Sequence, residues 1–450
     1  MLHKGEKSMN RKKVSGIIAI IMICSILGIS SKKIYADNTK NSQISVITPV
    51  KESKISVPTA EQIKEKKHFQ KLKDICKETQ PESLQTMDPI KSADLINTKI
   101  NTYLNAMDTN TLLLTIAETA DELSQYNDSS GLTIFSAVVQ NKLVPNLSSR
   151  DYIQLLNSND VNTYFKVFMI DTAIYSKKND EKFNRKLREL VKENMNNDEL
   201  LQSKGSSKIT DDSSALNSKE ELFNYSLQSI SDYNAKDVPM LKNVLDFDRF
   251  NDMAKMTALY KLSDIDKKTT DKYLDDIVKN KDKYTAGEEQ ASLFILSKYF
   301  RIYDDKEKYK RLLIKNADDI FKNNQLSNSS EDSKKLVDAA VFALGETKNK
   351  DSIRLVGNNM NSINDNAIVS YFVDMNFVII NEMLEDNNSK NDIKLALSLA
   401  DTSRYIEFSD NLEKLKNNPD KEISEKAASI LDKLDKNSDQ YRSEERRVGK

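Results

Sequence analysis

Residues 403–434, SRYIEFSDNLEKLKNNPDKEISEKAASILDKL, decide the fold of this chain. The stretch predicts two amphipathic helices joined by a short turn at Asn417, Asn418 and Pro419. The apolar residues at helical spacing are Ile406, Leu412 and Leu415 in the first helix and Ile423, Ala427, Ile430, Leu431 and Leu434 in the second. Neither apolar stripe can be buried within one helix pair, so the pair needs a stacked neighbour on each side.

The composition of the whole chain favours helices throughout. Its 450 residues include only 9 Gly and 7 Pro, and 30% of them are charged. Few turn-forming residues and many good helix formers argue against a sheet protein. We therefore predict an all-α fold, an α-solenoid of antiparallel helix pairs, which can bury one continuous seam with a hydrophobic content of only 38%.

The N-terminal 36 residues are similar to a secretory signal peptide. A basic start is followed by an apolar run from Val14 to Ile29, and small Ala36 marks a cleavage site before Asp37. This pattern predicts a secreted or cell-surface protein. The alternative is that residues 14–30 stay uncleaved and anchor the protein in the membrane, and the length of the run leaves that alternative open.

Cleavage after Ala36 would remove seven basic and one acidic side chain, which changes the net charge from −1 to −7. An acidic chain without a basic block predicts that no nucleic acid is a partner. The remaining chain keeps Cys76 as its one cysteine and His68 as its one histidine. An intramolecular disulfide and a zinc site of Cys/His type are therefore excluded by count.

The composition along the chain predicts its organisation. Residues 37–60 are polar, contain two prolines and are expected to form a disordered linker. Helical repeats are expected over 61–202 and again over 215–441. The Ser-rich stretch 203–214 between them is expected to be a linker or long loop.

Three local expectations can be compared with a structure. The first helix should run from about Glu61 to Thr79, and a helix from Leu132 should stop before Pro145. Residues 442–450, RSEERRVGK, resemble the translation of a common sequencing-library adapter and do not continue the helical pattern; the alternative is a natural charged tail. We expect them to be an artefact tail, so that the native sequence beyond Tyr441 is unknown; the cleaved chain without this tail would have a net charge of −9.

A family resemblance follows from residues 339–346, AAVFALGE, and the apolar positions Ile353, Leu355 and Val356 after them. An Ala- and Leu-rich helix that ends at a Gly, followed after a short polar turn by a second helix, resembles a HEAT-type repeat. Residues 392–434 resemble the family in the same way. The resemblance to HEAT/armadillo-like proteins covers roughly 236–435 and, more faintly, 88–200. It implies a scaffold for binding and carries over no catalytic residues.

The residues that could carry catalysis do not form a motif. His68 and Cys76 stand eight positions apart in one expected helix, about 12 Å of rise, which is too far for a hydrogen bond. We interpret both as semi-buried packing residues. No Gly-x-Ser-x-Gly motif or phosphate-binding Gly-rich loop occurs.

Calcium could use the acidic stretch from Asp246 to Asp252, but the stretch lacks the Gly and the distal Glu of an EF-hand. We interpret these residues, and likewise Asp264, Asp266 and Asp271, as helix caps. The sequence thus predicts no catalytic, cofactor-binding or metal-binding residue.

An aromatic stretch and a Lys-rich stretch are also interpreted as structural rather than functional. The aromatic clusters at 299–303 and 371–372 stand at core spacing and are expected to pack inside rather than to form a ligand platform. The Lys-rich stretch 306–311 is interleaved with acids and is expected to be a solvated face.

These observations favour an exported, non-enzymatic helical-repeat scaffold that binds a protein or a cell-wall polymer. The alternative is an all-helical cell-wall or carbohydrate-active enzyme with paired carboxylates, against which stands the absence of Trp for sugar subsites. A third hypothesis is a structural or assembly factor anchored by residues 14–30.

Overall fold

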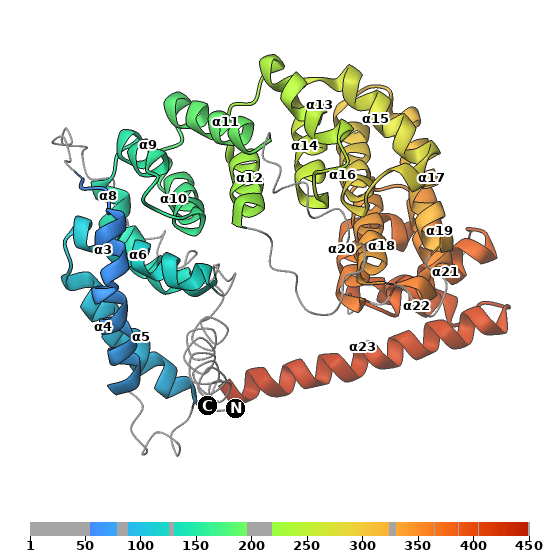
Figure 1. Ribbon diagram of the computed structural model, residues 1–450. Coiled ribbons are helices and arrows are strands. Elements are labelled where there is room, and N and C mark those ends of the chain that lie inside the picture. The colour runs from blue at the N-terminus through green and yellow to red at the C-terminus, as the bar shows by residue number, and fades with distance from the viewer. Residues whose placement is uncertain are drawn as a thin grey trace, which may run out of the picture. The chain divides into compact units, whose positions relative to one another are not determined.

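The computed structural model describes residues 55–78, 89–125, 130–195, 218–323, 330–363, 365–385, 387–403 and 405–448. Every regular element in these ranges is a helix, which confirms the predicted all-α class (Figure 1). The predicted signal peptide, most of the predicted linker at 37–60 and the predicted linker at 203–214 lie outside the described residues. The chain divides by its contacts into two compact units, residues 1–233 and 234–450, which are described separately below.

The first unit contains two rows of helices. Helices α6, α10 and α12 pack in succession, α9 packs on α10 and α11, and α3 and α4 pack on α6. Because α12 packs on α10 and α11, it belongs to this unit. The elements are α3 (Ala60–Glu65), α4 (Lys67–Glu78), α5 (Pro89–Ala106), α6 (Thr109–Ser124), η3 (Ser130–Phe135), α7 (Ser136–Val138), η4 (Val139–Leu143), α8 (Val144–Asn146), α9 (Ser149–Asn157), α10 (Thr163–Tyr175), α11 (Glu181–Met195) and α12 (Ser218–Ser229).

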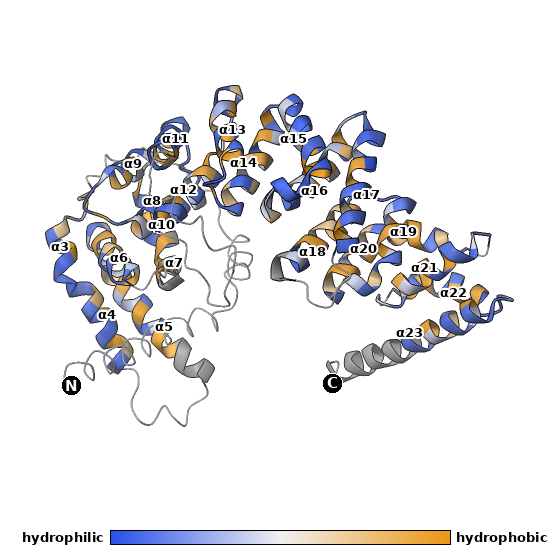
Figure 2. Cartoon of the chain, turned by 45° about the vertical axis from the view of Figure 1, so that its right-hand side comes forward, coloured by the Kyte–Doolittle hydropathy of each residue, from blue (hydrophilic) through white to orange (hydrophobic). Residues whose placement is uncertain are grey.

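The second unit also has two rows. Helices α14, α16, α18 and α20 pack in succession to form the even row, and α15, α17, α19, α21 and α23 form the odd row. Most of these helices have one hydrophobic and one hydrophilic side (Figure 2). The elements are η6 (Ala235–Asp237), α13 (Val238–Asp246), α14 (Asp252–Ile265), α15 (Lys267–Lys279), η7 (Lys281–Lys283), α16 (Ala286–Ile302), α17 (Lys306–Asn323), α18 (Glu331–Gly345), α19 (Lys350–Asn358), η8 (Met360–Ser362), α20 (Asn366–Met383), α21 (Lys390–Ala400), η9 (Ile406–Phe408), α22 (Ser409–Leu415) and α23 (Lys421–Val448).

Ion pairs join neighbouring helices of the odd row near their N-terminal ends. Each pair connects the N-terminal part of one helix with the N-terminal part of the next, within two turns of the helix start or at the residue just before it. The helices of the row therefore run parallel. The pairs are Lys308–Asp271 at 3.2 Å, Lys310–Asp351 at 3.5 Å, Arg354–Asp392 at 2.8 Å and Lys390–Asp420 at 3.4 Å. Lys306, Glu307 and Arg311 are exposed, as expected of a solvated face, and Lys308 and Lys310 in addition reach across to neighbouring helices.

The expected first helix, from Glu61 to Thr79, is two helices. Lys66 has a left-handed backbone (φ 49°), which ends α3, and α4 begins at the next residue. The Nζ atom of Lys66 lies 2.6 Å from the carboxylate of Glu122 on α6. This ion pair holds the break in place, a tertiary contact that local propensity could not indicate.

The helix expected to stop before Pro145 differs as well. A 3₁₀ turn, η3, and a π turn, η4, interrupt it, and Pro145 lies inside the short helix α8. The first turn of a helix tolerates Pro because its missing N–H would have had no partner within the helix there.

The opening stretch forms the predicted pair, α22 and α23, and its apolar residues from Leu412 to Leu434 are buried. Ile406 was expected in the buried stripe but is 58% exposed, because it lies in the 3₁₀ turn η9 before α22 begins. The backbone of α23 stays helical up to Val448, through most of the predicted tail. The predicted turn after Gly345 is confirmed, since α18 ends there and Asn349 caps α19.

Candidate binding surface

Four aromatic side chains, one from each helix of the even row, form what we call the aromatic row: Tyr260 (α14), Phe294 (α16), Phe342 (α18) and Tyr371 (α20). The ring centroids of Phe294 and Phe342 lie 5.6 Å apart in an edge-to-face arrangement. Those of Phe342 and Tyr371 lie 5.0 Å apart and are stacked. None of the four residues is fully buried, so the row reaches the surface of the unit.

Exposed apolar side chains on the same helices extend the row. Tyr260 is 44% exposed, Met253 about two helix turns before it is 47% exposed, and Val378 on α20 is 65% exposed. Met375 is half-buried one turn after Tyr371. Single exposed hydrophobic residues are normal on a protein surface, but exposed residues at both ends of a row of partly exposed aromatic rings are typical of a contact surface.

Ion pairs lie at the margin of this apolar surface. Lys298 pairs with Asp264, and its Nζ atom lies 5.2 Å from the ring centroid of Tyr260. Arg301 near the end of α16 pairs with Glu346. An apolar centre with a charged rim is the anatomy of protein–protein interfaces.

The geometry of the rings decides which kind of ligand they suit. The planes of Phe342 and Tyr371 differ by only 4°, so the facing surfaces of the two rings cover each other. Those surfaces are closed to a pyranose ring. Stacking removes one face of each ring from contact with a sugar, and the ring edges with the neighbouring aliphatic side chains suit the apolar side chains of a protein.

A second aromatic cluster, formed by Tyr299, Tyr303 and Tyr309, lies between α15, α16 and α17 and surrounds Lys267. The Nζ atom of Lys267 lies 5.0–5.9 Å from the three ring centroids and 2.8 Å from Asp271. Burial lowers the pKa of Lys267, but the hydrogen bonds and charges of Asp271 and Tyr309 together outweigh burial, and the pKa is raised. The ring faces are thus occupied by the chain's own cation.

The predicted core position of the aromatic clusters is confirmed for Tyr299 and Phe372, both 0% exposed. It is wrong for Tyr371, which is half-buried in the aromatic row, and for Ile302, which is 58% exposed.

His68 and Cys76 both lie on α4. The Nδ1 atom of His68 lies 3.4 Å from the hydroxyl of Tyr103, while Cys76 is buried further along α4. Glu118, which is 0% exposed, accepts hydrogen bonds from the backbone N–H groups of His68 and Phe69 at 2.8 and 2.7 Å. Burial raises the pKa of Glu118 despite these bonds. The carboxylate therefore caps the first turn of α4.

The predicted caps are confirmed for two residues, Asn251 and Asp266, whereas Asp246 accepts a hydrogen bond from the Tyr273 hydroxyl. Asn251 accepts a hydrogen bond from Ala254 N–H at 2.9 Å and caps α14, and Asp266 does the same for α15. Asp264 and Asp271 instead form ion pairs. In the part of the chain that the structure describes, no group of three or more His, Cys, Asp or Glu residues is arranged to hold a metal ion.

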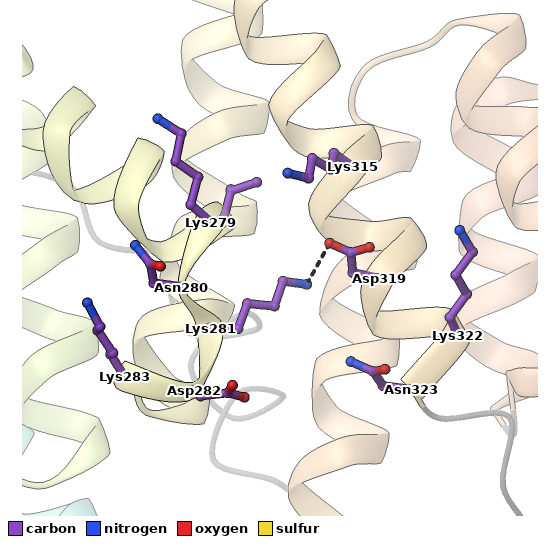
Figure 3. Close-up of a pocket in the computed structure, with 10 residues that line it drawn as sticks. Lys279, Asn280, Lys281, Asp282, Lys283, Lys315, Asp319, Lys322 and Asn323 are labelled. Atoms are coloured by element: carbon purple, nitrogen blue, oxygen red, sulfur yellow. Dashed lines mark ion pairs between the residues drawn. The ribbon is translucent and has the colours of Figure 1, made fainter.

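A hollow of about 420 Å³ lies between the end of α15, η7 and α17 (Figure 3). Its lining includes five lysines and two aspartates: Lys279, Lys281, Lys283, Lys315, Lys322, Asp282 and Asp319. Lys281 and Lys315 point into it from opposite sides. The chain as a whole carries a net charge of −1, so this basic lining is a local feature.

Over the described ranges, no helix is both long and apolar enough to cross a membrane. The apolar run from Val14 to Ile29 lies outside those ranges.

No protein-family model matches the chain, and no curated protein matches it. Sequence reasoning missed the aromatic row and the basic hollow. The signal for the row is one aromatic residue on the outer side of every second helix, and it emerges only when the helices are aligned in space.

Proposed function

We propose that the protein is an exported, non-enzymatic helical-repeat scaffold, HEAT/armadillo-like in its stacking, that binds a partner protein over the aromatic row. The stacking rests on the two rows of the second unit, in which each helix contacts the next but one along the chain. In such an array each unit buries its apolar face on its neighbours and leaves one side of each row open.

The aromatic row is the observation that carries the binding function. It places rings of four successive even-row helices on one surface, with Lys298–Asp264 and Arg301–Glu346 at its margin. Aromatic anchors surrounded by polar contacts are where binding energy concentrates in protein interfaces. The stacked pair of Phe342 and Tyr371 favours a protein over the cell-wall polymer, the other partner considered from the sequence.

The test measures saturable binding of a partner isolated from surface extracts on the mature chain. The double variant Tyr260→Ser/Val378→Ser removes two exposed side chains of this surface without touching the core. We expect this double variant to lose about 1.4 kcal/mol or more of binding free energy, which corresponds to an affinity at least tenfold weaker.

The matched control is Leu95→Ser/Tyr175→Ser in the first unit, whose side chains are similarly exposed at 42% and 44%. The control should bind like the unchanged chain. Equal affinity of both double variants would show that the partner does not use the aromatic row, and the proposal would fail.

Two other hypotheses have their own tests. The paired-carboxylate enzyme gains no support from Glu118, because this buried acid caps α4; release of sugar from cell walls by the purified chain would revive that hypothesis. A mature N-terminus at Asp37, found by terminal sequencing, would support export and eliminate the membrane-anchored assembly factor.

A further inference from the structure

The exposed stripe of α20 changes from apolar to acidic along the helix. Met375 and Val378 belong to the apolar surface around the aromatic row, and Val378 is 65% exposed. Glu382 follows Val378 after about one helix turn, roughly 6 Å further along the axis, and Glu385 comes just after the end of the helix. Both glutamates are exposed. We call Glu382 and Glu385 the acidic end of the surface.

Both glutamates stand where a helix disfavours negative charge. The C-terminal end of a helix carries about half a negative charge of its own, so cations stabilise it and acids do not. At the other end of α20 the carboxylate of Asp365 accepts a hydrogen bond from the Ala367 N–H, which is the arrangement that a helix favours. In the described part of the chain neither glutamate has an ion-pair partner, and Lys414 on α22 contacts Asn411 instead. The stability of α20 therefore gives no reason for the acidic end.

The surroundings of the acidic end stay negative when every neighbouring helix is counted. Residues 366–434, from α20 to the packed part of α23, contain thirteen acidic and eight basic residues, a net charge of −5. Two helices outside this segment also pack on α20; α18 carries a net charge of −1 and α19 one of +1, so the two cancel. No Lys or Arg occurs from Leu355 to Ser389, a stretch that includes the whole of α20.

Cations at the margin and the helix dipoles do not remove this surplus. Lys306 and Lys348 line an open hollow together with Met375, and counting both changes the balance from −5 to −3. The dipoles of α20, α21 and α22 add no net charge, because both ends of each helix lie in the segment, and the N-terminus of α23 adds about half a positive charge. A surplus of about two to three negative charges therefore remains in this part of the second unit.

We propose that the acidic end selects the partner, whose contacting segment carries Lys or Arg residues next to apolar side chains. This inference rests on the proposed function and names the chemistry of the partner. Apolar side chains of the segment cover Met375 and Val378, and its cations pair with Glu382 and Glu385. Exposed charges of one sign beside an apolar patch steer an oppositely charged partner to it and reject others. The same charges repel an identical surface on a second copy and an anionic membrane.

Fluorescence anisotropy of a short labelled peptide, with Leu and Lys placed in the order of an amphipathic helix, tests the charge requirement. The peptide is titrated with the full chain at low salt. It should bind saturably, and Glu382→Gln/Glu385→Gln should weaken binding about fivefold, as expected for the loss of two exposed ion pairs. The control Glu61→Gln/Glu65→Gln makes the same change in net charge at exposed glutamates of α3 and should bind within about twofold of the unchanged chain. A peptide with Glu in place of Lys should not bind.

The glutamate variant should keep its fold, since removing acids from the C-terminal end of α20 does not weaken the helix. Its urea midpoint should therefore be no lower than that of the unchanged chain. Absence of saturable binding of the Lys peptide, saturable binding of the Glu peptide, or an equal loss in both double variants would overturn the proposal. Self-association of the chain or binding to vesicles of phosphatidylglycerol, if either is lost in Tyr260→Ser/Val378→Ser, would assign the surface to another occupant and overturn it as well.

The partner isolated from surface extracts separates this inference from the proposed function. If Tyr260→Ser/Val378→Ser weakens binding of this partner while Glu382→Gln/Glu385→Gln does not, the aromatic row binds the partner and the acidic end does not select it. If neither variant weakens binding, the proposed function fails as well. A loss in both variants supports both.

Discussion

The buried ion pair between Lys255 on α14 and Glu288 on α16 provides the sharpest test of how the second unit is held together. The two side chains are 6% and 1% exposed, and the Nζ atom lies 3.6 Å from the carboxylate. Lys255→Met keeps most of the aliphatic stem but leaves the charge of Glu288 buried without its cation. Breaking a buried pair in this way costs about 3–5 kcal/mol.

The lower end of that range is expected here, because the Glu288 carboxylate still accepts the Thr285 N–H at 2.9 Å in the capping box. A loss of about 3 kcal/mol is a change of more than a hundredfold in the unfolding equilibrium. With an m-value of about 2 kcal/mol/M, the urea midpoint of the second unit should fall by roughly 1.5 M. Circular dichroism at increasing urea measures this midpoint.

The double variant Lys255→Met/Glu288→Gln separates the charge from the packing. Gln can still accept the hydrogen bond of the capping box, and the double variant should return to within about 1 kcal/mol of the unchanged chain. Lys421→Met, at a side chain 86% exposed, should leave the midpoint where it is. The reasoning is refuted if Lys255→Met costs less than 1 kcal/mol, or if the second substitution brings no recovery.

Three further predictions concern helix contacts, and urea unfolding measures each of them. Gly287→Ala should destabilise the second unit by about 1–3 kcal/mol, because the added Cβ would lie 2.5 Å from the backbone oxygen of Asp252; an unchanged midpoint would contradict this close approach. Asp392→Asn should cost about 1 kcal/mol at pH 7, since Arg354 is partly exposed. The hydrogen bond from Arg354 lowers the pKa of Asp392, so its contribution is present above pH 4 and should shrink as the pH falls through the folded-state pKa; a difference between the two proteins that does not shrink with falling pH would argue against the ion pair. Glu118→Ala leaves two N–H groups of α4 without their acceptor and should cost about 2–4 kcal/mol, whereas Glu118→Gln should cost much less; equal costs would rule out the capping role.

The all-α class and many of the helices could be predicted from the sequence, because apolar spacing and capping residues are local signals. Asp108 and Asp266 each begin a helix where their side chains accept from the first turn. The pair at 403–434 was predicted from its apolar stripes for the same reason. The prediction that Ile406 is buried was wrong because apolar spacing does not distinguish a 3₁₀ turn from the helix that follows it.

Features that depend on tertiary contacts could not be predicted in this way. The break at Lys66 depends on Glu122, fifty-six residues further along the chain. The aromatic row and the basic hollow depend on which helices lie side by side. A single ring such as Phe294, or a lysine at a helix end such as Lys279, looks the same in sequence whether it faces a neighbour or solvent.

The ion pairs of the odd row also bear on the mechanics of the second unit. Each pair reaches only the next helix, so Lys310–Asp351 and Arg354–Asp392 act beside the packing of successive helices in resisting a load along the row. At 1 M salt the screening length shortens to about 3 Å from about 10 Å at 0.1 M, which weakens the partly exposed links while the apolar seam stays closed. The unit should therefore behave as an elastic element whose stiffness, but not its helix content, falls as the ionic strength rises.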